Sequence, residues 1–169
     1  MLYMSTAMTW QTVSTGAAET ERLGELLGQS LRSPEVIELR SDLGGGKTTF
    51  VRGLARGLGS KDIVASPTFT LSKIYRGRDG QQIHHFDFYR LSEPGVVADQ
   101  LAESLNDPKV ITVVEWSDIV KDVLPENRLT IELKLTEKSE DERQITITYP
   151  ESRADVVKSV ETAWKQIKP

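Results

Sequence analysis

The sequence predicts an α/β fold, a three-layer sandwich whose central sheet is mostly parallel and carries β-hairpin additions. A short strand at 36–40 runs into a glycine-rich turn and then a helix from Lys47. The β-branched run at 110–114 reads as a strand buried on both faces, at the centre of a parallel sheet. An Asp-Gly turn within 76–80 and a polar loop at 136–143 predict the hairpins.

The elements of the first half follow from periodicity. Residues 9–14 alternate and favour β-prone types, so they predict a strand. The helix expected at 17–31 has a buried leucine stripe and stops before Pro34. The strand at 36–40 alternates apolar and charged residues, which suggests that one of its faces is only partly covered. The helix at 47–58 is closed by glycines, the last of them Gly59.

Similar patterns continue in the second half. Alternation predicts paired strands at 69–75 and 81–89, joined by the Asp-Gly turn. Leucines and valines at spacings of four predict a helix at 96–106. The remaining elements are a short helix or turn at 119–124, strands at 128–135 and 144–149, and a final helix at 154–167.

The composition bounds the classes of protein to consider. The 169 residues predict one domain spanning 1–169, with residues 1–8 as a flexible N-terminal extension. A net charge of −4 argues against tight nonspecific binding of nucleic acid, although a small basic patch is compatible with it. The chain contains no cysteine, no apolar run of membrane-spanning length and no convincing signal peptide. We therefore expect a cytoplasmic protein without membrane contact.

The glycine-rich turn carries the strongest chemical signal. Gly44, Gly45 and Gly46 precede Lys47 and Thr48, which matches the end of the pattern G-x-x-x-x-G-K-[ST]. Glycines allow backbone N–H groups to converge on phosphate oxygens at the start of the helix. Lys47 would reach the β- and γ-phosphates, and the Thr48 hydroxyl would ligate Mg²⁺. The fold expected from this motif is P-loop NTPase-like.

One position departs from that pattern. Counting back from Lys47, the first glycine of the motif is replaced by Ser41. A serine is tolerated there if its φ is negative. This substitution bears on how tightly the loop would bind a phosphate group, rather than on whether the segment is a phosphate-binding loop.

Two acidic residues fall where an open α/β sheet binds ligands, beyond the carboxyl ends of its strands. Glu115 directly follows the buried strand and could hold Mg²⁺. The alternative is that Glu115 merely ends a strand at the protein surface. Asp87 interrupts an aromatic run and could orient an attacking water or assist the metal. The alternative for Asp87 is an ordinary solvent-facing residue on a strand, and spacing leaves the two readings equal.

Other polar residues give weaker signals. Thr68 lies in a loop after the nucleotide helix, where a threonine can sense γ-phosphate and Mg²⁺, but Ser-Pro-Thr is also common in turns. His84 and His85 point to opposite faces of a strand, which is unsuitable for a metal site. Arg52 and Arg56 share a helix face that either meets water or contacts a partner or RNA, and water is the commoner case.

Four segments together resemble the TsaE (YjeE) family of small bacterial ATPases. They are residues 42–49 (DLGGGKTT), 66–71 (SPTFTL), 85–91 (HFDFYRL) and 115–116 (EW). Their order and spacing match the family over about residues 14–148. The resemblance implies an ATPase that binds ATP or ADP and Mg²⁺. It also implies partnership with TsaD and TsaB in making threonylcarbamoyladenosine at position 37 of tRNAs that read codons beginning with A. ATP hydrolysis would reset the complex between turnovers, and tRNA would be met only through the complex.

The resemblance also implies roles for individual residues. Thr48 and Glu115 would bind Mg²⁺, while Thr68, Asp87, Glu115 and Lys47 would serve catalysis. The departures from the family are Ser41 in place of Gly and Gly45 where Ala is common, and the second is expected to be harmless. The residues implied in nucleotide binding are Asp42, Leu43, Gly44, Gly45, Gly46, Lys47, Thr48, Thr49, Trp116 and Thr20.

Two other functions remain open from the residues alone. A small-molecule kinase would need an acceptor pocket and a lid, for which residues 93–107 could serve. A nucleotide-dependent assembly factor without catalysis would make Asp87 structural, so Asp87→Ala would leave complex function unchanged. No guanine-reading Asn-Lys-x-Asp motif is present, which favours ATP over GTP.

Overall fold

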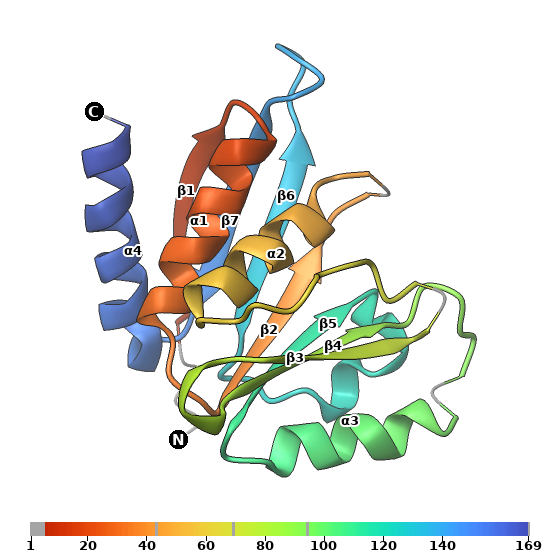
Figure 1. Ribbon diagram of the computed structural model, residues 1–169. Coiled ribbons are helices and arrows are strands. Elements are labelled where there is room, and N and C mark those ends of the chain that lie inside the picture. The colour runs from red at the N-terminus through yellow and green to blue at the C-terminus, as the bar shows by residue number, and fades with distance from the viewer. Residues whose placement is uncertain (1–5, 43, 69, 94, 169) are drawn as a thin grey trace.

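The described chain forms one seven-stranded sheet with helices on both faces (Figure 1). The structure is a computed structural model that describes residues 6–42, 44–68, 70–93 and 95–168. The strands are β1 (Met8–Ser14), β2 (Glu35–Arg40), β3 (Ser72–Arg76), β4 (Gln82–Asp87), β5 (Val110–Glu115), β6 (Leu129–Leu135) and β7 (Arg143–Tyr149). The main helices are α1 (Ala17–Ser30), α2 (Lys47–Gly57), α3 (Val97–Asn106) and α4 (Ala154–Ile167).

The strand order is β1-β7-β6-β2-β5-β4-β3. The four consecutive strands β6, β2, β5 and β4 run parallel to one another. The flanking pairs β1–β7, β7–β6 and β4–β3 are antiparallel. The parallel centre and the two predicted hairpins, β3–β4 and β6–β7, are therefore confirmed.

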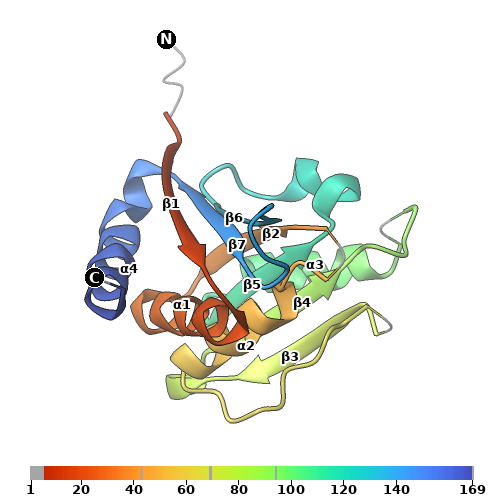
Figure 2. The ribbon, with the colours of Figure 1, turned by 90° about the horizontal axis from the view of Figure 1, so that it is seen from above.

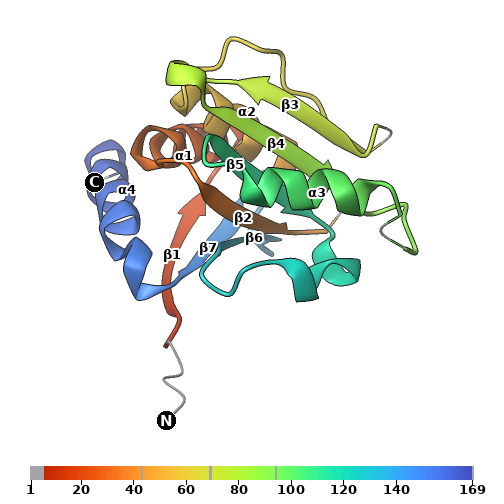
Figure 3. The same cartoon turned by 90° about the horizontal axis from the view of Figure 1, so that it is seen from below.

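Two hydrophobic cores lie on the two faces of the sheet. Helices α1 and α2 lie side by side over one face, and α4 packs beside α1 (Figures 1 and 2). Helix α3 packs against β5 on the other face, with two short 3₁₀ turns, Ser117–Ile119 and Lys121–Val123 (Figure 3). Across the described ranges, we find no helix with the length and apolar character to cross a membrane.

The burial of residues on the central strands β5 and β2 agrees with the sequence patterns, except at Glu38. All six residues of β5 are buried between β2 and β4, as the β-branched run predicts. On β2, Arg40 is exposed as expected of a partly covered face, but Glu38 is buried. Glu38 accepts a hydrogen bond of 2.7 Å from Arg128 Nε and pairs with Arg40. Burial alone would raise the pKa of Glu38, but these two guanidinium groups hold its pKa below the usual range.

The edge strand β3 begins later than the alternation predicts. A strand was expected over 69–75, whereas β3 covers Ser72–Arg76. The carbonyl of Pro67 accepts hydrogen bonds from the N–H groups of Thr70, at 3.1 Å, and Leu71, so the chain turns here. Leu71 has a positive φ of 66°, which a strand cannot accommodate. Phe69, a predicted inward residue of that strand, lies outside the described residues.

Helices α1 and α2 approach each other through glycines, two on each helix and four residues apart. The sequence pattern marked the end of α2 by its glycines and did not predict this contact. Because α2 starts at the glycine-rich turn, its packing on α1 also fixes the turn. A Cβ atom would lie 2.3 Å from Phe50 O at Gly24, 2.3 Å from Leu54 O at Gly28, 1.9 Å from Glu21 O at Gly53 and 2.1 Å from Glu25 O at Gly57.

Candidate functional site

The glycine loop, residues 41–49, joins the end of β2 to the start of α2. Gly44 and Gly46 have positive φ values of 75° and 100°, so a side chain would be strained at both positions. Gly46 is the N-cap residue of α2, and no side chain caps this helix end. The first N–H groups of α2 are therefore available to an anionic ligand. Leu43, a predicted contact residue, lies outside the described residues.

Lys47 is held at the centre of the loop. Its Nζ donates hydrogen bonds to the carbonyls of Ser41, at 3.1 Å, and Asp42, at 3.3 Å. The same Nζ lies 5.0 Å from the ring centroid of Trp116, within the range of a cation–π contact. Lys47 is only 8% exposed, so its ammonium group is placed by the backbone before any ligand arrives.

One pocket of about 260 Å³ brings together most of the predicted site residues. They come from the glycine loop, the loop before β3, and the ends of β4 and β5. The carboxyl ends of these parallel strands meet at one edge of the sheet, where the sequence predicts the ligand. The pocket is lined by Gly44, Gly45, Gly46, Lys47, Thr48, Thr49, Ser66, Thr68, Asp87, Glu115 and Trp116.

Asp87 and Thr68 contact each other in this pocket. Thr68 Oγ1 donates to Asp87 Oδ2 at 2.8 Å, and the backbone N–H of Tyr89 donates to Asp87 Oδ1 at 2.9 Å. Asp87 is 2% exposed, so the alternative of a solvent-facing strand residue is wrong. Both carboxylate oxygens are held, which ties the Thr68 loop to the end of β4.

Glu115 ends β5 beside Asp87, its partner in the register of the two parallel strands. It is 3% exposed, so the alternative of a surface strand end is wrong as well. Its Oε1 lies 2.9 Å from His85 Nε2. The carboxylate is thus fixed at the pocket by a hydrogen bond from the neighbouring strand.

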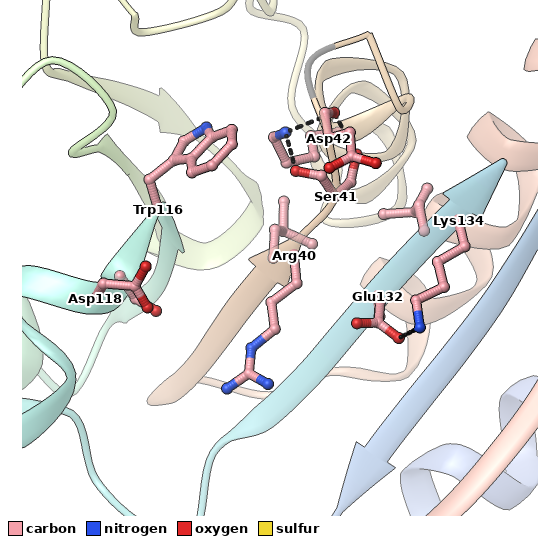
Figure 4. A pocket seen from close by; sticks show the side chains of 11 residues that line it. Arg40, Ser41, Asp42, Trp116, Asp118, Glu132 and Lys134 are labelled. Atoms are coloured by element: carbon pink, nitrogen blue, oxygen red, sulfur yellow. Dashed lines mark hydrogen bonds and ion pairs between the residues drawn. The ribbon is translucent and has the colours of Figure 1, made fainter.

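Trp116 separates this pocket from a second one. It adopts a left-handed backbone conformation, φ 54° and ψ 55°, which is unusual for a bulky residue, and its ring lies 4.9 Å from that of Tyr89. The second pocket, also about 260 Å³, shares Lys47 and Trp116 with the first. Figure 4 shows Arg40 within it, between Asp118 and Glu132.

Arg143, at the start of β7, is a loop contact that the sequence did not indicate. Its Nε donates to Gly45 O at 3.2 Å, and a terminal nitrogen donates to Gly44 O at 3.5 Å. A smaller pocket of about 140 Å³ lies here and is also lined by Thr20. Thr20 is buried, and its hydroxyl lies 2.6 Å from Ser14 Oγ. Arg143 follows a polar loop far along the chain, where no local pattern marks it.

The two histidines judged unsuitable for a metal site, and the two arginines of α2, all have partners within the protein. His85 is buried, whereas His84 is partly buried and lies 2.9 Å from Gln82 Oε1, and burial lowers the pKa of His84. Arg56 pairs with Glu21 of α1, and Arg52 lies 4.0 Å from the same carboxylate. The two arginines therefore bridge α1 and α2, besides meeting solvent.

Ser41 and Gly45 depend on each other. A Cβ atom on Gly45 would lie 1.7 Å from Ser41 Oγ and 2.8 Å from Ser41 Cβ. Ser41 Oγ donates to Asp42 O at 2.7 Å, so its orientation is held. The glycine at position 45 therefore makes room for the serine that departs from the usual motif.

If the loop binds a nucleotide, as the sequence predicts, Gly45→Ala should weaken ADP binding by about tenfold, because the new methyl group must displace Ser41 and disturb the loop. In a Ser41→Gly background the same substitution should have a smaller effect, since the two closest clashes are gone and only the approach to Asp42 O, at 3.0 Å, remains. Isothermal titration calorimetry on the four proteins of this double-mutant cycle measures the coupling. Equal effects of Gly45→Ala in both backgrounds would contradict it.

The donor groups at the pocket suit a magnesium ion. Thr48 and Glu115 both line it and both offer oxygen, the ligand atom that Mg²⁺ prefers. In the described part of the chain, no three His, Asp or Glu residues gather into a metal-binding group. Mg²⁺ usually takes only one or two protein ligands and completes its shell with phosphate oxygens and water. The residues present therefore fit a Mg²⁺–nucleotide complex better than a free metal ion.

The sequence matches proteins of one family. The family described as "Threonylcarbamoyl adenosine biosynthesis protein TsaE" matches residues 14–145 of the chain. A tRNA threonylcarbamoyladenosine biosynthesis protein TsaE from Treponema pallidum is 38% identical over 135 residues, covering 80% of this chain and 97% of the relative. The Bacillus subtilis protein of the same name is 36% identical over 149 residues, covering 88% and 89%.

A solved structure shows the same architecture. The crystal structure of Bacillus subtilis YdiB aligns with a TM-score of 0.73 at 32% identity. The alignment covers 96% of this chain and 99% of the other. The shared fold is that of a P-loop NTPase, with the glycine loop between a central strand and a helix.

Proposed function

Because the chain belongs to the TsaE family, we propose that it is a magnesium-dependent ATPase that acts with TsaD and TsaB in forming threonylcarbamoyladenosine on tRNA. Membership in this family confirms the resemblance that the four sequence segments indicated. The observation that carries the proposal is the single pocket joining the glycine loop to Thr68, Asp87, Glu115 and Trp116. Hydrolysis of ATP would reset the complex between turnovers, in the cytoplasm, with tRNA bound elsewhere in the complex.

The glycine loop would bind the triphosphate. The free N–H groups at the start of α2 and the ammonium group of Lys47 provide positive charge at one point. Arg143 donates to two loop carbonyls and so supports the loop from outside. These groups are fixed before binding, so they would stabilise the charge that moves between the phosphate oxygens in the transition state.

The acidic side of the pocket would hold the metal and the water. Thr48 and Glu115 would hold Mg²⁺, which when bound supplies further positive charge to the phosphates. Asp87 is close enough to share the pocket and would orient the attacking water. Thr68, bonded to Asp87, would report the presence of the γ-phosphate by exchanging that bond for one to the ligand.

The packing of helix α3 argues against the alternative of a small-molecule kinase. The stretch considered as a lid, residues 93–107, contains α3, which packs on β5. Ser104 of α3 lies 2.6 Å from Thr112 of β5 through their buried hydroxyl groups. A lid must open and close, whereas this helix is part of the hydrophobic core on the face of the sheet opposite α1 and α2.

We expect phosphate release from Mg-ATP to be slow for the purified chain and to rise when TsaD and TsaB are added. Among the described residues, no arginine lines the phosphate pocket, and an arginine finger is worth about 10³-fold or more when a partner supplies it. Glu115→Ala should abolish the increase, because Mg²⁺ loses a ligand. The assay compares phosphate release with and without the partners. High turnover by the chain alone, or activity indifferent to Glu115→Ala, would refute the proposal.

A further inference from the structure

His85 is a polar side chain fully enclosed in the core between the sheet and α2. Its exposed fraction is 0%, and it lies on β4 two residues after Ile83, which is buried in the same core. An apolar side chain of similar size would fill this space without desolvating two ring nitrogens. The histidine therefore calls for a polar reason.

The polar group that His85 contacts is the carboxylate of Glu115. His85 Nε2 lies 2.9 Å from Glu115 Oε1, and Nδ1 has no hydrogen-bond partner among the described residues. An ionised carboxylate can only accept hydrogen bonds, so Nε2 is the donor when Glu115 serves as an ionised metal ligand. The imidazole thus uses its single buried hydrogen bond to hold one oxygen of Glu115.

The packing around the ring keeps it in place. The ring of Tyr75 lies 6.4 Å from that of His85, tilted by 49°. Tyr75 is itself anchored, since its hydroxyl donates to Ala65 O at 2.8 Å. Burial raises the pKa of Tyr75, and the nearby charges of Glu115 and Asp62 raise it further. His85 therefore sits between a fixed aromatic ring and the carboxylate that it contacts.

We propose that His85 is a positioning residue that holds Glu115 Oε1 and thereby directs Glu115 Oε2 to a magnesium ion or its water in the pocket. This inference rests on the proposed function, in which Glu115 serves Mg²⁺. A hydrogen bond behind a metal ligand fixes the orientation of that ligand, and its loss typically weakens metal affinity by about 10- to 100-fold. His85 itself need not touch the ion or the nucleotide.

The test measures metal affinity rather than turnover. Mn²⁺, as a paramagnetic substitute for Mg²⁺, is titrated into the protein–ADP complex and followed by electron paramagnetic resonance. ADP affinity in EDTA is measured separately by calorimetry, with the thermal midpoint as a check on folding. His85→Phe keeps a planar ring, although a larger one, and removes the donor. His85→Gln places an amide N–H near the position of Nε2, whereas His85→Asn, equally polar, falls short of it.

We expect His85→Phe and His85→Asn to weaken Mn²⁺ binding by at least about tenfold while ADP affinity in EDTA is unchanged. His85→Gln should recover most of the loss. The contrast between Gln and Asn decides the matter even if the Phe variant does not fold. Unchanged Mn²⁺ affinity in His85→Asn, or equal losses for Gln and Asn, would overturn the inference and leave His85 a core residue.

Failure of the proposed function would look different. It would show as absent Mn²⁺ binding by the wild-type ADP complex, or as no effect of Glu115→Gln on that binding. Either result removes the metal role of Glu115, and with it the inference. Failure of the inference alone appears only in the His85 variants, with wild type and Glu115→Gln behaving as the proposed function requires.

Discussion

Lys47→Ala is expected to lower phosphate release from Mg-ATP by at least about 100-fold, with or without the partner proteins. The ammonium group is buried at the pocket and oriented by two loop carbonyls. A fixed positive charge that is largely withdrawn from solvent is worth more than one in bulk water. In the proposed function, its removal would take away charge stabilisation where the phosphate oxygens gain charge.

Lys134 provides the matched control. It lines the neighbouring pocket, is exposed and pairs with Glu132 at 3.2 Å. Lys134→Ala removes one positive charge close to the loop but leaves the phosphate pocket intact. Phosphate release should therefore change by less than about twofold. Equal losses in the two variants would mean that general charge, rather than the position of Lys47, governs activity.

Gly53→Ala is expected to lower the free energy of unfolding by about 3 kcal/mol or more. Its Cβ would lie 1.9 Å from Glu21 O and 3.0 Å from Glu25 N, both backbone atoms of α1 that cannot rotate away. The two helices must separate, which opens the core that they share on the sheet. Because α2 begins at Lys47, the separation also moves the glycine loop, and ADP affinity should fall.

Chemical denaturation followed by circular dichroism measures the first effect, and calorimetry with ADP measures the second. Gly16→Ala is the control, since nothing lies within 4 Å of a Cβ at Gly16 and its backbone is extended. The control should cost less than about 1 kcal/mol. A similarly small cost at Gly53 would show that α1 and α2 can adjust their separation freely.

Local patterns predicted the parts of the site that lie close together in sequence. The Gly-Gly-Gly-Lys-Thr run predicted the loop and the start of α2, and the β-branched run predicted the fully buried β5. Periodicity also placed the final helix over 154–167, where α4 lies. Such features depend on backbone preferences and on the burial of alternate residues, which neighbouring residues determine.

The spacing of residues alone did not decide whether the acidic residues Asp87 and Glu115 lie in the site. Asp87 was equally compatible with a solvent-facing position, because an alternating strand does not say which of its faces is covered. The register of β4 on β5 places it beside Glu115, and Thr68 and the N–H of Tyr89 then satisfy its carboxylate. Strand order and register therefore decided what the pattern could not.

By itself, the sequence determined the family, the α/β architecture and the loop with its lysine and threonine, because these follow from motifs and periodicities within short stretches of chain. Only the tertiary structure decided the contacts of Arg143 with the loop, the hydrogen bond from His85 to Glu115 and the dependence of Gly45 on Ser41. Each requires atoms from separate strands, or opposite ends of a turn, to meet within a few ångströms. Such distances are set by sheet register, helix packing and loop conformation, which no local pattern encodes.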